Sequence, residues 1–492
     1  MRALRTAFRA CLPGILLIVG TAGPALGDEL PATAAGAPST ITLAAPAPTI
    51  SGADTAFVMI CAALVLLMTP GLGLFYGGMV RRKNVLATFQ QSFILMGVMT
   101  LQWVLFGYSL AFAPDAFGGL IGGLDYVGLR GVGLDPHPTY GPTIPHQLFM
   151  AFQLMFAVIT PALISGAFAE RMKFSAYLLF TVLWATLVYD PVAHWVWGGG
   201  WIGAKLGALD FAGGLVVHVI SGVAALCAAM VVGRRKGLGE EEMHPHNLTM
   251  TALGTGLLWF GWFGFNAGSA LAANGAAVAA FVNTNTAAAA AAVSWSAVEW
   301  LHKKKVTVLG TCSGAVAGLV AVTPAAGYVT PMGSLIIGGL VSVACYAAIL
   351  IKGRLGYDDS LDVFGVHGVG GAFGALAVGF FATSAMTRIA GVADAPGGLF
   401  EGSTSQLVKQ AISLAAAAGY SFVVSFLLLK MVDLTVGLRV TAEEEDLGLD
   451  LSQHGERGYI MGVGELMGGH GGEGRRALAD AAVRRIEEAT RV

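Results

Sequence analysis

Eleven apolar runs, each long enough to cross a bilayer as a helix, follow one another along most of this 492-residue chain. A membrane-spanning helix needs about 20 mostly apolar residues, because lipid offers no partner for backbone polar groups. Charged residues make up only 12% of the chain, against roughly 25% in soluble globular domains. The sequence therefore predicts an all-α polytopic membrane protein. Its eleven transmembrane helices are expected at 54–80, 86–113, 146–169, 176–197, 212–232, 248–272, 278–301, 307–325, 333–351, 362–383 and 407–431.

The two ends of the chain differ in composition from these runs. Residues 1–27 have the basic, apolar and small-residue parts of a secretory signal peptide, whose apolar part is too short for an additional span. Residues 28–52 are rich in Ala, Pro and Thr, which is typical of a flexible extracytoplasmic leader. The membrane domain is expected over 53–431, and the residues 432–492, with 7 basic and 12 acidic side chains, form a predicted cytoplasmic tail.

Lys and Arg are distributed unequally between alternate loops of the predicted bundle. The loops on one side hold thirteen of them, whereas those on the other side hold only Arg130, Lys205 and Arg388. Cytoplasmic loops of membrane proteins are enriched in basic residues, so the thirteen are assigned to the cytoplasm. The N-terminus is then outside and the C-terminus inside, in agreement with a signal peptide and a multi-pass protein of the cytoplasmic (inner) membrane.

A weak internal repeat links the fifth and tenth runs. Asp210 precedes His218 by eight residues, Asp359 precedes His367 by eight, and glycines surround both histidines. Because a shift of five spans is odd, the two halves would be inverted in the membrane, giving a 5+5 inverted repeat plus one helix. Chance similarity between glycine-rich helices is the alternative.

The two histidines are the main candidates for chemistry inside the membrane. Ionisable side chains there are costly and usually face a partner or a cavity, although a lone histidine can also serve packing. Two at matching depths favour a paired site that lines a pore. The sequence has no H-E-x-x-H, no P-loop and no Cys/His cluster with metal spacing, so we expect no metal, no cofactor and no enzyme. Its low charge also argues against a nucleic-acid partner.

Several long strings of residues identify a family. They are F-Y-G-G-M-V-R-R-K-N-V-L at 75–86, I-S-G-A-F-A-E-R at 164–171, G-A-L-D-F-A-G-G-L-V-V-H at 207–218, G-W-F-G-F-N-A-G-S at 261–269, D-V-F-G-V-H-G-V-G-G at 362–371 and D-L-T-V-G-L-R-V at 433–440. On these strings the chain resembles the ammonium transporter/Rhesus protein family, in its bacterial ammonium transporter branch. The resemblance extends from Asp54 to about Tyr459.

The resemblance implies a homotrimer of subunits with one narrow, mostly apolar pore each. By the family pattern, the external recruitment site for ammonium corresponds to Trp197, Phe156 and Ser269, the phenyl gate to Phe156 and Phe265, and the pore histidines to His218 and His367. Supporting positions correspond to Asp210, Asp359, Gln153 and Tyr76. Considered without the resemblance, a Trp at the end of a span is typical of the interfacial belt, and Phe within a span is typical of packing.

These residue types suit transport of ammonium that excludes potassium. An indole face attracts either cation, so selectivity has to come from the proton that only ammonium can release. An apolar passage penalises any isolated cation, and paired neutral imidazoles can accept hydrogens from ammonia and pass a proton along. The sequence hypothesis is therefore ammonium uptake by conduction of ammonia with linked proton transfer, which is electrogenic.

Two further residues and the C-terminal tail have open interpretations. Asp210 lies at the start of its span, where a helix-capping role is favoured over a role as direct cation ligand. Asp190 is an acid within the fourth run and has no assigned role. By resemblance, the tail docks a PII-type nitrogen regulatory protein, with an unpartnered acidic tail as the alternative, and residues 475–492 could form an amphipathic helix.

Two other functions compete with an ammonium transporter. The first is a Rhesus-like channel for neutral ammonia or carbon dioxide, which Trp197 and the combination of signal peptide and tail disfavour. The second is a receptor that senses ammonium, for which the acidic tail is the sequence argument. Ammonium-induced current, its absence, or binding without flux would separate the three.

Overall fold

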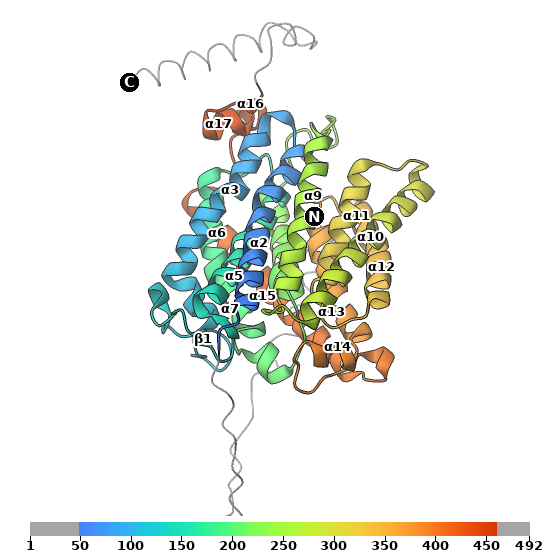
Figure 1. Ribbon diagram of the computed structural model, residues 1–492. Helices are drawn as coiled ribbons and strands as arrows, with labels where there is room; N and C mark the ends of the chain where they lie inside the picture. The colour runs from blue at the N-terminus through green and yellow to red at the C-terminus, as the bar shows by residue number, and fades with distance from the viewer. Residues whose placement is uncertain (1–48, 460–492) are drawn as a thin grey trace, which may run out of the picture. The chain divides into compact units, whose positions relative to one another are not determined.

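The described part of this computed structural model, residues 49–459, is almost entirely helical (Figure 1). The predicted signal peptide, most of the leader and the predicted helix at 475–492 lie outside the described residues. The described residues 49–459 lie in one compact unit. The first five predicted spans correspond to α2 (Gly52–Met79); α3 (Val85–Gln102), η3 (Trp103–Gly107) and α4 (Tyr108–Phe112); α5 (His146–Ile164) with η5 (Ser165–Ala167); α6 (Phe174–Trp184), η6 (Ala185–Tyr189) and α7 (Asp190–Val196); and η8 (Gly214–Val219) with α8 (Ile220–Val232).

The other six predicted spans are also helical. They correspond to α9 (Leu248–Gly268), α10 (Gly275–Lys303), α11 (Val308–Val322), α12 (Pro331–Leu355), η9 (Phe364–Gly368) with α13 (Val369–Phe381), and α15 (Ser405–Thr435). Short elements complete the described chain: η2 (Arg82–Asn84), η4 (Val127–Leu129), the hairpin of β1 (Pro136–His137) and β2 (Gly141–Pro145), η7 (Trp201–Leu206), α14 (Ser384–Ile389), η10 (Leu399–Glu401), α16 (Ala442–Leu447) and α17 (Leu449–His454).

Of the eleven helical spans in the described chain, ten are long and apolar enough to cross a membrane, and α11 is the exception. It has 15 residues, and most of them are buried between α9, α10, α12 and α13. At a rise of about 1.5 Å per residue, this helix is shorter than the hydrocarbon core of a bilayer. The turns that follow it, over residues 323–329, are also buried, so the segment crosses the interior of the bundle with protein on its sides. The fold is thus a polytopic membrane bundle of ten long helices and one short one.

Four spans contain a π-helical segment, in which each N–H bonds to the carbonyl five residues earlier. These segments are η3, η6, η8 and η9. Such turns insert an extra residue into an α-helix, and in proteins they often lie at functional sites. Two of them contain the candidate histidines, since His218 lies in η8 and His367 in η9.

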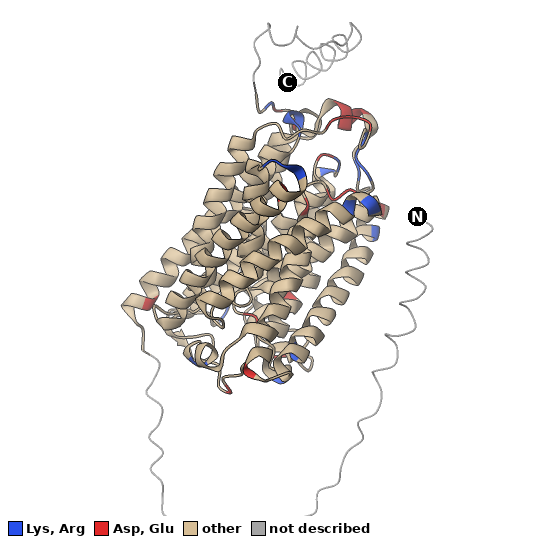
Figure 2. Cartoon of the chain, turned by 90° about the vertical axis from the view of Figure 1, so that its right-hand side faces the viewer, with Lys and Arg blue, Asp and Glu red and all other residues tan. Residues whose placement is uncertain are grey.

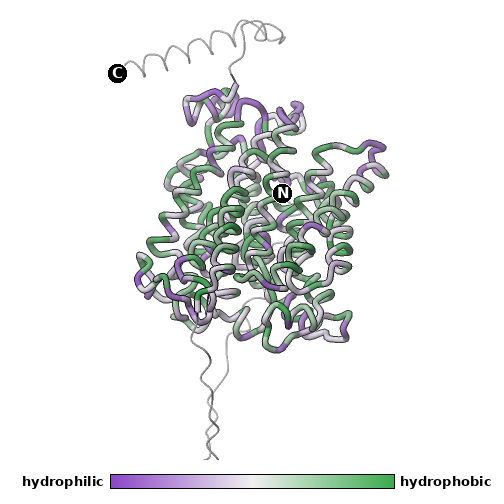
Figure 3. Tube along the Cα trace, viewed as in Figure 1, coloured by the Kyte–Doolittle hydropathy of each residue, from purple (hydrophilic) through white to green (hydrophobic). Residues whose placement is uncertain are grey.

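Charged residues gather at one end of the bundle, where α16 and α17 lie (Figure 2). The sides of the helices are largely hydrophobic (Figure 3). Ion pairs of Arg81 and Arg235 with Glu170 show that loops far apart in sequence meet at this end, which we call the basic end. The loops that the sequence predicts to be rich in Lys and Arg therefore lie at one end of the structure.

Arg171 is the centre of the buried polar network at the basic end. Its side chain is fully buried and donates to the carbonyl oxygens of Gly233 (2.8 Å), Ala167 (3.0 Å) and Asp358 (2.5 Å). Burial lowers the pKa of Arg171 to about 10, with Asp358 acting in the opposite direction. Burial also disfavours the charged form of Asp358, but hydrogen bonds from Arg235 hold the pKa of this carboxyl below its usual value. One guanidinium thus joins three loops.

The first part of the tail is folded against the loop between α2 and α3. Lys83 donates to the carbonyl oxygens of Glu445 and Asp446 at 2.8 Å each, and the Asp450 carboxylate accepts from the Ala87 N–H at 2.8 Å. Helix α16 starts with a capping box formed by Thr441 and Glu444. Helix α15 continues to Thr435, four residues beyond the predicted end of the last span at 431.

Replacing Arg171 with Met should strongly destabilise the fold. The substitution leaves several buried carbonyl oxygens without a donor and removes a buried charge partner, which typically costs about 3–5 kcal/mol. Thermal unfolding of the detergent-solubilised protein should therefore occur at a clearly lower temperature. Arg130→Met, at an exposed arginine, is the matched control and should unfold like the parent protein. Equal unfolding temperatures for the two variants would contradict the role assigned to Arg171.

Candidate functional site

Two buried histidines meet in the interior of the bundle. The Nδ1 atoms of His218 and His367 are 3.2 Å apart, and the two rings are inclined by only 28°. Both side chains are at most 3% exposed. For a hydrogen bond between two neutral rings, one Nδ1 must carry the proton and the other must accept it. The Nε2 atom of His218 has no hydrogen-bond partner among the described residues and is free to bind a small molecule.

Glycines allow the two histidine-bearing helices to approach this closely. A Cβ atom on Gly222 would lie 2.1 Å from the backbone nitrogen of Gly368, and a Cβ atom on Gly371 would lie 2.9 Å from the Cβ of His218. Each of these glycines, Gly222 and Gly371, follows the histidine of its own helix by four residues, or one turn. Gly222 therefore contacts the second histidine-bearing helix beside His367, and Gly371 contacts the first one beside His218. The two contacts have the same relative arrangement.

An acidic side chain binds the free N–H groups at the start of each histidine-bearing segment. The Asp210 carboxylate accepts from four backbone N–H groups, those of Gly213, Gly214, Leu215 and Val216, at 2.6–3.4 Å. The Asp359 carboxylate accepts from Val363 and Phe364 at 3.1 and 2.8 Å. These are the bonds of a helix cap, the role favoured for Asp210 from sequence. Burial raises the pKa of Asp210 to about 6, and its backbone hydrogen bonds oppose the rise.

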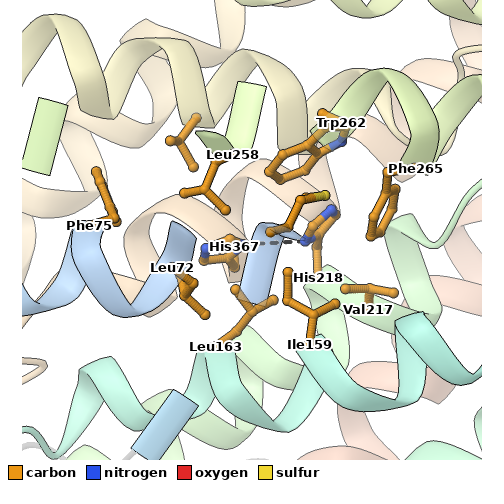
Figure 4. A pocket seen from close by; sticks show the side chains of 12 residues that line it. Leu72, Phe75, Ile159, Leu163, Val217, His218, Leu258, Trp262, Phe265 and His367 are labelled. Carbon is orange, nitrogen blue, oxygen red and sulfur yellow. Dashed lines mark hydrogen bonds between the residues drawn. The ribbon is translucent and has the colours of Figure 1, made fainter. Parts of the chain in front are cut away.

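A narrow cavity surrounds the histidine pair (Figure 4). Besides His218 and His367, its lining consists of apolar and aromatic side chains: Met68, Leu72, Phe75, Ile159, Leu163, Val217, Leu258, Trp262, Phe265 and Val316. None of these lining residues is an Asp, Glu, Lys or Arg. A charged species in this cavity would have no ionic partner and little water, whereas a small neutral molecule could hydrogen-bond to an imidazole.

Trp262 is a lining residue to which the sequence did not assign a role. Its ring is nearly parallel to that of His218, with centroids 5.4 Å apart, and its Nε1–H donates to the Thr323 hydroxyl at 2.9 Å. It lies on one face of α9 with Phe265 and Ser269, three and seven residues later. That spacing was the available signal, but the contact with a histidine from another helix depends on the tertiary structure.

Aromatic rings form a row from the histidines toward the end opposite the basic end. The Phe265 ring lies 6.1 Å from His218, Phe156 lies 4.4 Å from Phe265, and Trp197 lies 5.9 Å from Phe156, all between centroids. Phe156 and Phe265 are inclined by 53°, so the predicted gate pair is in contact but tilted, not stacked. The indole N–H of Trp197 donates to the Asp210 carbonyl oxygen at 2.9 Å, which fixes the outer ring of the row.

The remaining predicted site residues lie around this row. Ser269 lies one turn beyond Phe265, and its hydroxyl donates to the Phe265 carbonyl oxygen at 2.9 Å, which leaves its lone pairs available. Gln153 is buried one turn before Phe156, and its Oε1 has no partner among the described residues. Tyr76 lies on the other side of the histidines and donates to the Leu163 carbonyl oxygen at 2.9 Å.

A second cavity continues from the histidines toward the basic end. It shares Phe75, Val316 and His367 with the first cavity and is also lined by Tyr76, Ser313 and Asp362. Asp362 forms an ion pair with Lys352. The two cavities and the aromatic row follow one another through the interior of the bundle, with His218 and His367 between the row and the second cavity. In residues 49–459, no cluster of three or more His, Cys, Asp or Glu side chains could hold a metal.

Comparisons with known proteins agree with this architecture. Residues 56–459 match the model of the Ammonium Transporter Family. The chain is 58% identical to an ammonium transporter of Bacillus subtilis over 82% of its own length and 98% of that protein. It is 47% identical to the ammonium transporter Amt1 of Archaeoglobus fulgidus over 83% of its length and all of that protein.

Solved structures have the same fold. The crystal structure of Saccharomyces cerevisiae Mep2 superposes with a TM-score of 0.77 at 36% identity, covering 84% of this chain and 93% of that one. A sensor Amt protein superposes with a TM-score of 0.74 at 31% identity, covering 82% and 98%. Because the family model spans most of the sequence and the relatives match along nearly their whole length, this chain belongs to the ammonium transporter family.

Proposed function

We propose that this protein transports ammonium across the cytoplasmic membrane, by taking the proton from ammonium and conducting ammonia past His218 and His367 with linked proton transfer. The observation that most supports this mechanism is the apolar, uncharged lining around a hydrogen-bonded pair of neutral imidazoles. A permanent cation would lose its hydration there without compensation. Ammonium can avoid that cost because it can release a proton.

Recruitment of ammonium is assigned to the outer end of the aromatic row. Trp197 is half-buried and its N–H is bound to Asp210, so its ring has a fixed orientation and a face available for a cation. A cation over an indole face gains about 0.5–2 kcal/mol. The Ser269 hydroxyl, with its proton donated to Phe265, offers lone pairs to an ammonium N–H. Potassium gains from the same ring face, so this site concentrates cations without selecting strongly among them.

Phe156 and Phe265 separate the recruitment site from the histidines. Their centroids are 4.4 Å apart and both side chains are 1% exposed, so the passage is closed unless one ring moves. A buried aromatic gate excludes bulk water and therefore raises the cost of passage for any ion. Ammonium that reaches this point is expected to release its proton before ammonia passes.

The histidine pair offers both a donor and an acceptor to ammonia and to a proton. The Nδ1 atoms already share one hydrogen bond, while the Nε2 of His218 has no partner in the described chain. A proton added at one outer nitrogen can leave from the other after the shared hydrogen shifts, so the pair suits a relay. Net transfer of ammonia plus a proton moves one positive charge, which makes the transport electrogenic.

The arrangement in the membrane is also part of this proposal. We infer an N-terminus outside, a cytoplasmic basic end and a 5+5 inverted repeat with α15 as the extra helix. The positive-inside rule supports the orientation, and the matching glycine contacts and acidic caps of the two histidine segments support the repeat. A homotrimer and a PII-type nitrogen regulatory protein docked on the basic end and tail, 432–492, follow from family resemblance.

A role in sensing ammonium is the second candidate function. It is favoured by the likeness to a solved sensor Amt protein and by a tail that is folded against the loops of its own chain. A sensor would bind ammonium without large flux. A neutral gas channel, the third alternative, would give flux of ammonia without current. Ammonium-induced current therefore identifies the transporter, and flux of ammonia without current separates a gas channel from a sensor.

Replacing either histidine with Ala should abolish most of the ammonium-induced current on proteoliposomes, because the variant has no second imidazole to complete the relay. Methylammonium current should fall in parallel, and potassium should give no current in the parent protein. His302→Ala is the control, since His302 bonds to Tyr346 at the basic end of α10 and α12. An undiminished current that still excludes potassium would rule out the relay.

Replacing Trp197 with Leu should raise the ammonium concentration that gives half-maximal current by roughly 2- to 30-fold, as the loss of 0.5–2 kcal/mol predicts. The maximal current should change little, because the histidine pair is intact. Trp195→Leu is the matched control: Trp195 lies on α7, which ends immediately before Trp197, and its N–H donates to the Leu120 carbonyl oxygen instead. Equal effects of the two substitutions would argue against a specific recruitment role for Trp197.

The orientation can be tested by labelling single cysteines in intact cells with a membrane-impermeant maleimide. Asp125→Cys, in an exposed loop at the end opposite the basic end, should react in intact cells. Glu242→Cys, in an exposed loop at the basic end, should react only after permeabilisation. The four native cysteines of the described chain are buried and should contribute little background. The reverse labelling pattern would invert the proposed topology.

A further inference from the structure

One buried acid in the membrane-spanning bundle is not used by the transport mechanism. Asp190 is fully buried in the fourth span. Its Oδ2 lies 2.7 Å from the Nε2 of Gln102, a buried residue of the second span. Its Oδ1 has no hydrogen-bond partner among the described residues. A carboxylate with one donor partner in such a site would be poorly stabilised, because both oxygens need donors when the group is charged.

The partner amide is also incompletely bonded. The Oε1 of Gln102 is buried and has no donor among the described residues. Two neighbouring groups thus each have an acceptor oxygen without a hydrogen, which indicates that one hydrogen is missing from the pair. A half-turn of the Gln102 amide exchanges its oxygen and nitrogen and would place Oε1 about where Nε2 lies, 2.7 Å from Oδ2. A proton on the carboxyl then satisfies the amide oxygen.

The pair lies where two spans change from one helix type to another. Gln102 is the last residue of α3 before the π-helical η3, and Asp190 is the first residue of α7 after the π-helical η6. The amide lies directly against Gly107 in η3, because a Cβ atom there would be 2.5 Å from Oε1. The Gln102 Nε2 also lies 3.4 Å from the Thr186 hydroxyl of η6. The amide therefore connects two irregular points of the backbone.

Helix α7 connects this pair to the proposed recruitment site. It contains seven residues and ends immediately before Trp197. Side-chain contacts hold it along its length: Asp190 to Gln102 at its start, His194 to the Ala111 carbonyl oxygen (3.0 Å) and the Asp115 carboxylate (3.3 Å) in its middle, and the Trp195 N–H to the Leu120 carbonyl oxygen (2.7 Å) near its end. The N–H of Trp197, the next residue, donates to the Asp210 carbonyl oxygen. Asp190 lies where the π-helical η6 passes into α7 without a break in the helix, so a shift of this turn would be transmitted along α7 to Trp197.

We propose that Asp190 is a neutral, protonated carboxylic acid whose O–H donates to the Gln102 amide oxygen, and that this bond is a positioning contact for α7 and Trp197. The acid neither binds ammonium nor exchanges protons with it. Being uncharged, it fixes the helix without placing a competing cation site in the apolar interior. The positioning role rests on the proposed function of Trp197, whereas the protonation of Asp190 does not.

Infrared spectroscopy tests the protonation directly. The carbonyl stretch of a carboxylic acid absorbs apart from the stretches of a carboxylate, so the spectrum of the parent protein minus that of Asp190→Asn at neutral pH should contain one acid band. Asp394→Asn, at an exposed acid, is the control and should remove carboxylate bands only. Carboxylate bands in the Asp190 difference spectrum would show an ionised side chain and would overturn the proposal.

Ammonium-induced current tests the positioning role. Asp190→Leu should raise the half-saturating ammonium concentration at least about twofold with little change in maximal current, because networked residues are usually coupled by at least that much. Asp190→Asn should restore the parent value, since an amide can bond to Gln102. In a Trp197→Leu background, Asp190→Leu should add no further effect. Independent, multiplying effects would overturn the role, as would failure of Asn to rescue.

A second variant covers the case in which Asp190→Leu does not fold. Gly107→Ala would push the Gln102 amide away from Asp190 and should raise the half-saturating concentration in the same way. If Trp197→Leu itself has no effect on that concentration, the recruitment site in the proposed function is wrong and the positioning role falls with it. The infrared result then still decides whether Asp190 is protonated, so the two failures are distinguishable.

Discussion

The free-energy cost of an unpaired charge away from water determines the architecture of this protein and, in the proposed mechanism, its selectivity. At the basic end, where charge is present, buried groups such as Arg171 are surrounded by acceptors. In the first cavity, where ammonia is proposed to pass His218 and His367, the lining has no Asp, Glu, Lys or Arg. The same cost that keeps charges at the ends of the helices thus penalises ions in the middle. A cation that can release a proton escapes this penalty, and one that cannot is excluded.

Much of the fold could be predicted from the sequence because its determinants are local or additive. The spans follow from the lengths of the apolar runs, and the proposed orientation follows from the unequal number of Lys and Arg residues in alternate loops. The structure has a helix at each of the eleven predicted runs. The short α11 could not be distinguished, because its apolar run continues into buried turns that the sequence does not separate from helix. The π-helical segments were missed for a similar reason, since an inserted residue leaves no distinctive composition.

The sequence indicated which residues belong to the candidate site, but not which of them are in contact. The equal spacing of Asp210 to His218 and of Asp359 to His367 indicated paired histidines, but the Nδ1 to Nδ1 contact depends on helices crossing at Gly222 and Gly371. Trp262 was visible on the same face as Phe265, yet its contact with His218 arises only when α9 packs beside η8. Contacts between distant segments depend on backbone approach, which a single sequence does not specify.

The two histidine segments combine a fixed start with an irregular backbone. Eight residues separate each capping acid from its histidine, so the caps Asp210 and Asp359 fix the start of each histidine-bearing segment at the same distance along the chain from its imidazole. A π-helical turn then shifts side chains relative to a regular α-helix, and a glycine one turn later lets the other helix approach. Substituting the glycine would separate the rings while leaving both histidines and both capping acids in place. The contact between the two imidazoles therefore depends on the backbone as much as on the two side chains.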